Sequence, residues 1–432
     1  MTPSARLSAL IELLDIIENT ARPADALVSA YFRQRRYIGS KDRGAVSQEL
    51  YALLRHYGRL TWWLNYLKAE RTGRNLAIAY LFFVTKQSRS EIEAQFNGSK
   101  YAPAALEAPE NKLLRDLKGH TFSHPQMPPS LANECPEWAY DTLKQRFGKT
   151  LERELAAMLQ PAPLDLRANP LNITRDEALE QLKKLDLVVK PTSYSPYGLR
   201  VMNRPALGSI ALLKNGSLEI QDEGSQLVAL LCEAKPGERI VDFCAGAGGK
   251  TLTLAACMEN KGRITACDVL ANRLKRAEER FRKAGFHNIE THALESERSP
   301  WVKRHKESFD RVLVDAPCSG TGTWRRNPDA RWRNLGPGLD ILVPLQDSIL
   351  QSASRLVKKG GRLVYATCSL LPDENEQQVQ KFLDNNPDFK LVPVQSCTSF
   401  IASLPDTGDM MLLSPAQHGS DGFFAAVMQR QT

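Results

Sequence analysis

The sequence predicts an α/β protein whose C-terminal half is a doubly wound, mostly parallel sheet. From about residue 217, short apolar strand segments alternate with amphipathic helical segments, which is the pattern of a sheet with helices on both faces. Residues 1 to about 130 show helical apolar stripes, and a strand–helix–strand pattern follows them. We therefore predict an all-α domain over 1–135, a small α+β module over 136–216 and an α/β domain over 217–432.

Length and composition indicate a soluble protein of several domains. The chain has 432 residues, which is more than one ordinary hydrophobic core accommodates. Of these residues, 42% are hydrophobic and 25% are charged, as in soluble globular proteins. No apolar run is long enough to cross a bilayer and the N-terminus has no signal-peptide core, so we expect a cytoplasmic monomer without a membrane partner. The net charge of +8 suits a polyanionic partner but does not prove one.

The cysteines predict neither a zinc site nor disulfides. None of the eight forms a Cys-x-x-Cys pair, so we expect no metal, and a reducing compartment disfavours disulfides. Each cysteine is then either core filler or a reactive thiol. They lie at positions 135, 232, 244, 257, 267, 318, 368 and 397.

The N-terminal region carries several helical patterns. Apolar residues spaced by three and four form one stripe over 7–17 and another over 46–57, and residues 61–67 and 76–84 add two apolar segments. The prolines between 106 and 130 indicate an irregular connection. A basic cluster with interleaved aromatics lies between the stripes, and it fits either a solvated helix face or a phosphate-contacting RNA surface. Its residues are Tyr31, Phe32, Arg33, Arg35, Arg36, Tyr37, Lys41 and Arg43.

The middle and C-terminal segments follow the predicted alternation. Residues 163–169 alternate like a strand, 174–185 form a helix that Thr174 and Glu177 open as a capping box, and 188–202 are extended. Beyond them, strands are predicted over 239–243, 263–268, 309–315, 362–367 and 422–430, with helices over 272–284 and 339–357.

A glycine-rich loop follows the first of these strands and ends in Lys250. A P-loop would need glycine at Cys244, and a dinucleotide fingerprint would need glycine at Thr251. What remains is typical of an S-adenosylmethionine pocket, where backbone and a helix N-terminus approach a nucleoside and an amino acid. The candidate cofactor contacts in the loop are Cys244, Ala245, Gly246, Ala247, Gly248, Gly249 and Lys250.

Two acidic strand ends extend this pocket. Asp268 ends the second strand, where a carboxylate can accept both ribose hydroxyls, although a lone Asp there is often a helix cap. Arg273, at the start of the next helix, is a weaker cofactor candidate. Asp315 ends the third strand and is a candidate for both cofactor and base binding.

Two cysteines follow two neighbouring predicted strands, Cys318 after the third and Cys368 after the fourth. An isolated Asp-Ala-Pro-Cys also fits a turn with a buried cysteine. If the strands are neighbours, however, both thiols reach the cofactor edge of the sheet. Carbon 5 of a pyrimidine becomes nucleophilic when a thiolate adds to carbon 6, and a thiolate is both a good nucleophile and a fair leaving group. Asp315 would then hold the ring through N3 and the exocyclic amine.

The segments DFCAGAGGK, DAPCSGTG and ATCS together resemble the Sun/Fmu (RsmB-like) family of RNA 5-methylcytosine methyltransferases. Residues 221–226 resemble the QDEAS element of that family, and the N-terminal region resembles the NusB-like RNA-binding domain of its bacterial ribosomal RNA branch. The resemblance implies a Rossmann-like methyltransferase domain, an RRM-like middle module, S-adenosylmethionine as cofactor and ribosomal RNA as partner. It also implies that Cys368 is the nucleophile and that Cys318 assists release of the methylated base.

One departure from the family pattern concerns the adenine contact. The family usually has Asp near the end of the strand around 288–294, where this chain reads His292-Ala293-Leu294. Glu295 is one replacement, and a backbone contact is the other. The loop also reads AGAGGK where the family usually has proline before the paired glycines.

A segment rich in arginine and tryptophan directly follows the Cys318 loop. Arginine guanidinium groups donate paired hydrogen bonds to phosphates, and aromatic rings stack on unpaired bases. We therefore expect this segment to bind RNA at an unpaired target base. The alternative is a surface loop anchored by its tryptophans. The candidate RNA-binding residues are Trp324, Arg325, Arg326, Arg331, Trp332 and Arg333.

The activity expected from these observations is methylation of carbon 5 of a cytosine in ribosomal RNA, with the small-subunit 16S RNA as substrate. Transfer RNA is an alternative substrate. A DNA-type enzyme would use Cys318 as nucleophile, together with a Glu-Asn-Val motif that this sequence lacks. A non-enzymatic RNA-binding assembly factor is the third alternative, against which the intact thiols and glycine loop argue.

Overall fold

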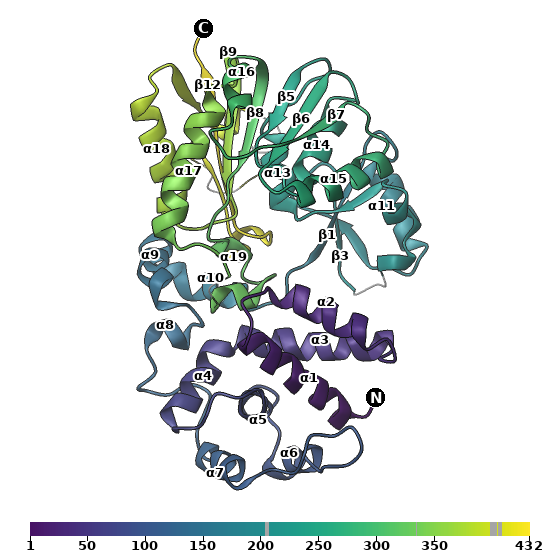
Figure 1. The fold of residues 1–432 in the computed structure, drawn as a ribbon, viewed down its shortest axis with the longest axis vertical. Helices are drawn as coiled ribbons and strands as arrows, with labels where there is room; N and C mark the ends of the chain where they lie inside the picture. The colour runs from purple at the N-terminus through teal and green to yellow at the C-terminus, as the bar shows by residue number, and fades with distance from the viewer. Residues whose placement is uncertain (204–206, 334, 398–403, 405–407) are drawn as a thin grey trace. The chain divides into compact units, whose positions relative to one another are not determined.

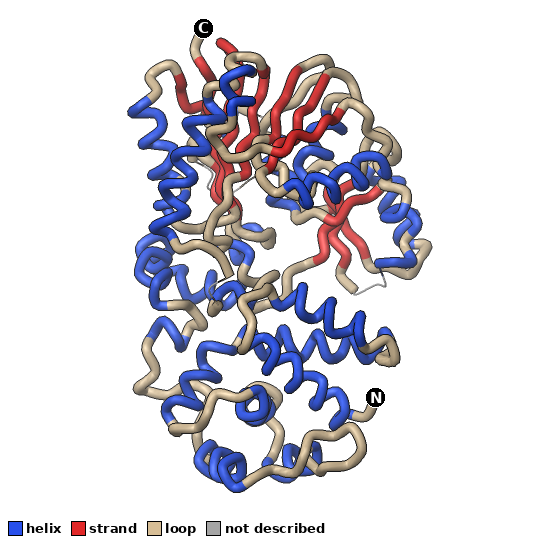
Figure 2. The backbone as a smooth tube through the Cα atoms, viewed as in Figure 1, coloured by secondary structure: helices blue, strands red, loops and turns tan. Residues whose placement is uncertain are grey.

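The computed structural model describes residues 1–203, 207–333, 335–397, 404 and 408–432 (Figures 1 and 2). The chain divides into two compact units. The helical unit contains Met1–Gln160 together with Trp324–Gly336, and the α/β unit contains Pro161–Thr323 and Pro337–Thr432. None of the helices formed by the described residues has the length and apolarity that crossing a bilayer requires.

The helical unit is built from short helices around one apolar core. The predicted stripe over 7–17 is buried along α1, whose N-terminus is capped by the Thr2 hydroxyl. The expected irregular connection over 106–130 is wrong in part, because a capping box starts helix α7 inside it. The helices are α1 (Pro3–Glu18), α2 (Ala24–Gln34), α3 (Ser40–Arg55), α4 (Tyr57–Tyr66), α5 (Gly73–Phe83), α6 (Arg89–Gln95), α7 (Ala108–Leu117), α8 (Pro129–Ala132), α9 (Glu137–Phe147) and α10 (Leu151–Met158).

The basic cluster between α1 and α3 is partly internal. Tyr31 and Phe32 are buried, Arg35 lies over the Tyr31 ring at 3.9 Å, and Arg43 donates to the Ile38 carbonyl. Tyr37, by contrast, is 81% exposed. Two of the arginines therefore stabilise local structure, and RNA binding by this surface stays a prediction.

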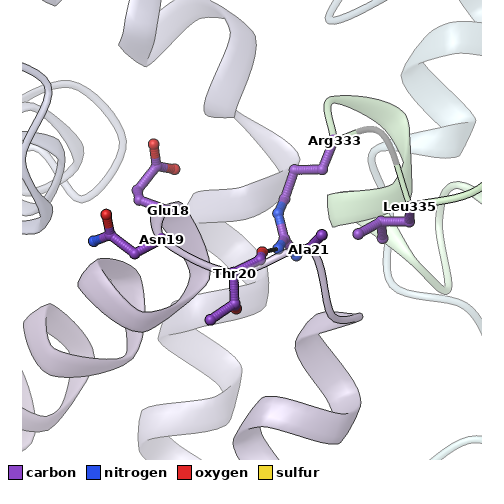
Figure 3. A pocket seen from close by; sticks show the side chains of 6 residues that line it. All are labelled: Glu18, Asn19, Thr20, Ala21, Arg333 and Leu335. Atoms are coloured by element: carbon purple, nitrogen blue, oxygen red, sulfur yellow. Dashed lines mark hydrogen bonds between the residues drawn. The ribbon is translucent and has the colours of Figure 1, made fainter.

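Residues 324–333 follow β8 (Phe309–Asp315) in the chain but pack into the helical unit. Trp324 and Arg331 are 0% and 2% exposed, and the Arg331 guanidinium lies over the Trp324 ring while donating to the carbonyls of Glu134 and Met158. In Figure 3, Arg333 reaches the Thr20 carbonyl across a hollow that Glu18–Ala21 and Leu335 also line.

The RNA-binding prediction for this segment needs correction where the side chains are buried. Trp324, Arg325 and Arg331 are buried and unavailable to a base or phosphate, because they fill the helical unit instead. Trp332 packs against the helical core, within reach of Gly58, and Arg333 is engaged with Thr20 and Asp329. Arg326 is half-buried, and RNA contact by its side chain stays a prediction.

A small antiparallel sheet opens the α/β unit. Its strand order is β2-β3-β1-β4, and the predicted capping box of Thr174 and Glu177 opens helix α11. Because β4 pairs with β1, the small sheet extends past the predicted boundary at residue 216. The elements are β1 (Leu164–Ala168), α11 (Arg175–Lys183), β2 (Val189–Pro191), β3 (Gly198–Val201), α12 (Ala211–Lys214) and β4 (Leu218–Ile220).

The main sheet has strand order β10-β12-β9-β8-β5-β6-β7, with β11 paired to β12. Strands β5 to β9 are mutually parallel and β12 is antiparallel to β9. The predicted strands are confirmed, although β9 begins at Val357, where the sequence predicted the last residue of a helix. The strands are β5 (Arg239–Asp242), β6 (Arg263–Asp268), β7 (Ile289–Ala293), β8 (Phe309–Asp315), β9 (Val357–Thr367), β10 (Phe389–Val392), β11 (Met411–Leu413) and β12 (Phe423–Arg430).

Helices cover both faces of this sheet (Figure 1). Leu313 faces a core formed with α13, α14 and α15, whereas its neighbours Val312 and Val314 face a core formed with α16, α17 and α18. This alternation is why the strands read as continuous apolar runs. The helices are α13 (Glu223–Leu230), α14 (Gly249–Cys257), α15 (Ala271–Lys283), α16 (Pro300–Arg304), α17 (Leu339–Ser354), α18 (Glu376–Asn385) and α19 (Pro415–His418).

Buried polar contacts join the small sheet to the main one. The Arg167 guanidinium on β1 donates to the Gln221 side chain at 2.7 Å, and the same oxygen accepts from Thr253 on α14 at 3.2 Å. Arg280 on α15 donates to Glu219 on β4 and to the Ala247 carbonyl of the glycine loop. The small sheet is therefore fixed to the helices that flank this loop.

Replacing Arg331 tests its role as an internal anchor. We expect Arg331→Met to destabilise the helical unit by roughly 3 kcal/mol, because it removes two buried hydrogen bonds to main-chain carbonyls and a positive charge that acts on the buried Glu134 carboxyl group. Scanning calorimetry would measure the shift, with the exposed Arg22→Met as a control that should melt like the parent protein. A variant with parental melting and weakened RNA binding would instead restore the original RNA-contact interpretation.

Candidate active site

The candidate site lies at the carboxyl ends of the parallel strands. The glycine loop follows β5, Asp268 ends β6, and Asp315 ends β8. Cys368 directly follows β9, and Asp315 pairs in register with Ala366. Since parallel strands end at one edge, these groups share the edge at which open α/β sheets bind ligands.

The two strand-end thiols lie against each other. Cys318 Sγ is 3.4 Å from Cys368 Sγ, and both cysteines are free. The Gly322 amide donates to the Cys368 carbonyl at 2.9 Å, and the hydroxyls of Ser319 and Ser369 are 3.2 Å apart. The structure therefore brings together two loops that are fifty positions apart in the chain.

The surroundings of Cys318 keep its proton on sulfur. The hydrogen bond with Cys368 and burial raise the pKa of Cys318 well above its usual range, and the charges of Cys368 and Glu374 act in the same direction. A thiol held in this way is a poor attacking group at neutral pH. In this arrangement of the two thiols, Cys318 is therefore a weak nucleophile.

An ion pair between buried Lys250 and half-buried Asp315 joins the glycine-loop helix to the end of β8. Lys250 Nζ lies 2.7 Å from a carboxylate oxygen of Asp315. Burial disfavours the charged ammonium, but the Asp315 carboxylate outweighs it and raises the pKa of Lys250 above its ordinary value. Lys250 is thus a fixed positive charge in the site, more closely engaged than its sequence position indicated.

The glycine loop owes its shape to two left-handed residues. Gly246 and Gly248 have φ of 56° and 79°, and a Cβ at Gly248 would lie 2.4 Å from the Phe281 ring. Asp268 accepts from the Gly246 amide at 2.8 Å and from the Leu270 amide at 2.7 Å. Asp268 therefore orders the loop while keeping lone pairs for a ligand.

The remaining predicted cofactor residues differ in accessibility. Ala245 is buried, Cys244 and Gly249 are half-buried, and Ala247 and Arg273 are exposed. At the departure from the family pattern, the His292 ring stacks on Trp301 with centroids 5.2 Å apart. Ala293 and Glu295 are exposed, and the adenine contact stays a prediction for Glu295 or backbone.

Sequence reasoning missed two buried residues beside the thiols. Glu374 and Asn375 lie just after the Cys368 loop and are fully buried, and their side chains bond to residues that flank the two cysteines. The only sequence signal was a run of polar residues, PDENE, after the fourth strand. Such a run is ordinarily a solvated turn and helix start.

The fold and the site together define a Rossmann-like methyltransferase that uses S-adenosylmethionine, and comparisons with known proteins agree. A family model described as 16S rRNA methyltransferase RsmB/F matches residues 229–429. A second, described as the ferredoxin-like domain of RsmF/B-like methyltransferases, matches residues 135–207. The chain belongs to the RsmB/F methyltransferase family.

Individual relatives extend the similarity along the chain. A probable ribosomal RNA small subunit methyltransferase B of Synechocystis is 36% identical over 297 residues, which span 68% of this chain and 66% of the relative. Ribosomal RNA small subunit methyltransferase B of Photorhabdus laumondii is 29% identical over 91% of this chain and 92% of its own length. The solved structure of a methyltransferase homologue from Pyrococcus horikoshii is 29% identical with a TM-score of 0.60, covering 70% of this chain and all of that one.

The residues at the strand ends fit S-adenosylmethionine. This ligand offers ribose hydroxyls and an ammonium as donors, and the site offers the Asp268 carboxylate and the buried carboxyl group of Asp242 as partners. One oxygen of Asp242 accepts from the Thr251 hydroxyl at 2.7 Å, while the other is buried without a hydrogen-bond partner among the described residues. A buried acceptor of this kind is costly unless a ligand satisfies it.

Replacing Asp268 tests the ribose contact. We expect Asp268→Asn to weaken binding of S-adenosylhomocysteine by roughly 10- to 100-fold, because a charge-assisted hydrogen bond is lost. Isothermal titration calorimetry would measure the affinity. Asp310→Asn, at the opposite end of β8, is the matched control and should bind normally. Unchanged affinity in Asp268→Asn would contradict this contact.

Asp242 gives a pH-dependent prediction. Burial is the main cause that raises the pKa of this carboxyl from 3.8 to about 7. The native state therefore holds a proton that the unfolded chain has released between these two values, and stability falls as the pH rises through that window. We expect the melting temperature of Asp242→Asn, relative to the parent, to rise from pH 4 to about pH 7 and then to level off. A difference independent of pH would show that Asp242 ionises normally.

Proposed function

We propose that the protein transfers a methyl group from S-adenosylmethionine to carbon 5 of a cytosine in ribosomal RNA, through a covalent bond between Cys368 and carbon 6. The observation that carries the proposal is the 3.4 Å contact between Cys318 and Cys368 at the edge that also holds the glycine loop. The names of the bacterial relatives, ribosomal RNA small subunit methyltransferase B, support small-subunit 16S RNA as the substrate.

The first step is attack by Cys368 on the pyrimidine. Its thiolate forms a sulfur–carbon bond to carbon 6, and the electrons of the 5,6 double bond make carbon 5 nucleophilic. The Asp315 carboxylate holds the ring by accepting from the exocyclic amine, and from N3 once N3 is protonated in the adduct, with Lys250 fixing the carboxylate at 2.7 Å. S-adenosylmethionine, when bound, supplies an electrophilic methyl group. Holding the ring and the thiol in one geometry supplies much of the acceleration.

The second step is release of the product. Carbon 5, which by then carries the transferred methyl group, loses its proton to a base, the 5,6 double bond forms again, and the bond between carbon 6 and Cys368 breaks with its electrons returning to sulfur. Both the hydrogen bond and the charge of Cys368 raise the pKa of Cys318, so adduct formation removes both influences. The Cys318 thiol then ionises more readily and assists release as a base beside the ring.

The RNA and the setting of the reaction complete the proposal. A cytosine must leave its stack to reach thiols at a sheet edge, so an unpaired or flipped base is the target. Arg326 and the basic cluster around Tyr37 supply the proposed phosphate contacts. We place the reaction in the cytoplasm, with the protein acting as a monomer.

Replacing each of the two cysteines in turn tests which one is the nucleophile. On unmodified 16S RNA, we expect Cys368→Ala to lower methyl transfer on the order of 10³-fold or more, because it removes the nucleophile. Cys318→Ala should instead accumulate a protein–RNA adduct that survives denaturing electrophoresis. Cys257→Ala, which is remote from the strand-end edge, is the control.

The opposite result would reverse the roles of the thiols. If Cys318→Ala abolished adducts while Cys368→Ala retained them, the DNA-type arrangement with Cys318 as nucleophile would replace this mechanism. RNA binding without transfer by the parent protein would favour a non-enzymatic assembly factor, and selective methylation of transfer RNA would change the substrate.

A further inference from the structure

Two consecutive buried residues, Glu374 and Asn375, contact the loops of both thiols. They lie between β9 and α18, where Glu374 ends a short 3-10 helix and Asn375 precedes α18. Both side chains are 0% exposed. The hydrogen bonds of their side chains run to different loops, which separates their effects on Cys318 and Cys368.

Glu374 holds the residues on either side of Cys318. One carboxylate oxygen accepts from the Ser319 amide at 2.8 Å and from the Gln346 side chain at 2.9 Å. The other accepts from the Ser319 hydroxyl at 2.5 Å. Gln346 also donates to the Pro317 carbonyl at 2.9 Å, so Glu374 and Gln346 together fix the backbone before and after the thiol.

Asn375 does the same for Cys368. Its side-chain oxygen accepts from the Thr367 hydroxyl at 2.5 Å, and its amide nitrogen donates to the Ser369 carbonyl at 2.9 Å. Asn at a helix start ordinarily caps the first free amides of the helix. Here it makes no such capping bond, because both ends of the side chain are used by the Cys368 loop.

The cost of burial supports a role beyond packing. A buried carboxylate destabilises a protein unless hydrogen bonds satisfy both of its oxygens. An apolar side chain of similar size would occupy the same space at a lower free-energy cost. The hydrogen bonds of the Glu374 carboxylate go to Ser319 and Gln346, which hold the backbone around Cys318. Burying this side chain is unfavourable by itself, but its hydrogen bonds hold the Cys318 loop in one position.

We propose that Glu374 and Asn375 are positioning residues for separate steps, Asn375 for attack by Cys368 and Glu374 for release assisted by Cys318. The inference rests on the proposed function for the meaning of these steps. The contacts predict that loosening one loop affects one step more than the other, since misplacing a reacting group by about 1 Å costs on the order of 10²-fold.

The experiment compares Glu374→Ala and Asn375→Ala in single-turnover reactions with unmodified 16S RNA. We expect Asn375→Ala to slow adduct formation on the order of 10- to 100-fold without accumulating adduct. Glu374→Ala should form adduct at a near-parental rate but release it on the order of 10- to 100-fold more slowly. Glu374→Gln should restore much of the release rate, because its amide oxygen still accepts from the Ser319 amide and its nitrogen can donate to the Ser319 hydroxyl.

A second readout needs neither RNA nor S-adenosylmethionine. Iodoacetamide labelling followed by peptide mass spectrometry measures the reactivity of each thiol. Glu374→Ala should change the labelling rate of Cys318 more than that of Cys368, and Asn375→Ala should do the reverse. The matched control is Asn169→Ala, which removes a buried amide bonded to the Ala284 carbonyl in the same unit and should change neither the step ratio nor the labelling ratio.

The outcomes separate this inference from the proposed function. Equal slowing of both steps by both variants, with equal changes in labelling, would assign the pair a general structural role and overturn the inference. If Glu374→Ala does not fold, the comparison of Asn375→Ala with Gln346→Ala, which removes the hydrogen bonds to Glu374 and to the Pro317 carbonyl, decides by the same criteria. Methyl transfer by Cys368→Ala would overturn the proposed function, while selective labelling would still support separate positioning of the thiols.

Discussion

Asp315 lies opposite Ala366 in the parallel pairing of β8 with β9, so the loops that follow the two strands leave the sheet side by side. The thiol contact and the hydrogen bonds between the two loops depend on this register. A shift by one residue would turn every side chain of a strand to the other face. The apolar alternation of β8 between two cores therefore fixes the chemistry as well as the fold.

Charge is buried around this edge in a consistent arrangement. Lys250 and Asp315 compensate each other, Glu374 is satisfied by donors that surround the Cys318 loop, and Asp242 retains an acceptor without a partner among the described residues. Satisfied groups stiffen the loops, whereas the unsatisfied one marks where a ligand donor fits. The site is thus rigid around the thiols and incomplete near the glycine loop.

The sequence was sufficient to predict the catalytic sheet, because continuous apolar runs ending in Asp268 or Asp315 indicate buried parallel strands. It was insufficient for the segment from Trp324 to Arg333. Alternating arginine and tryptophan residues are typical of RNA-binding segments, but the same side chains also stack on each other inside a protein. Only the three-dimensional contacts of Arg331, with Trp324, Glu134 and Met158, show that this segment is internal. Glu374 was missed for a related reason, since its partner Ser319 lies fifty-five positions away.

The assignment of residues 324–336 to the helical unit also constrains the order in which the protein can fold. The helical unit contains a piece of chain that is synthesised after β8 and before β9. Its core therefore lacks Trp324 and Arg331 until most of the protein has been made. Folding of the two units is interleaved along the chain, and cutting the protein at residue 160 would separate the helical unit from part of its own interior.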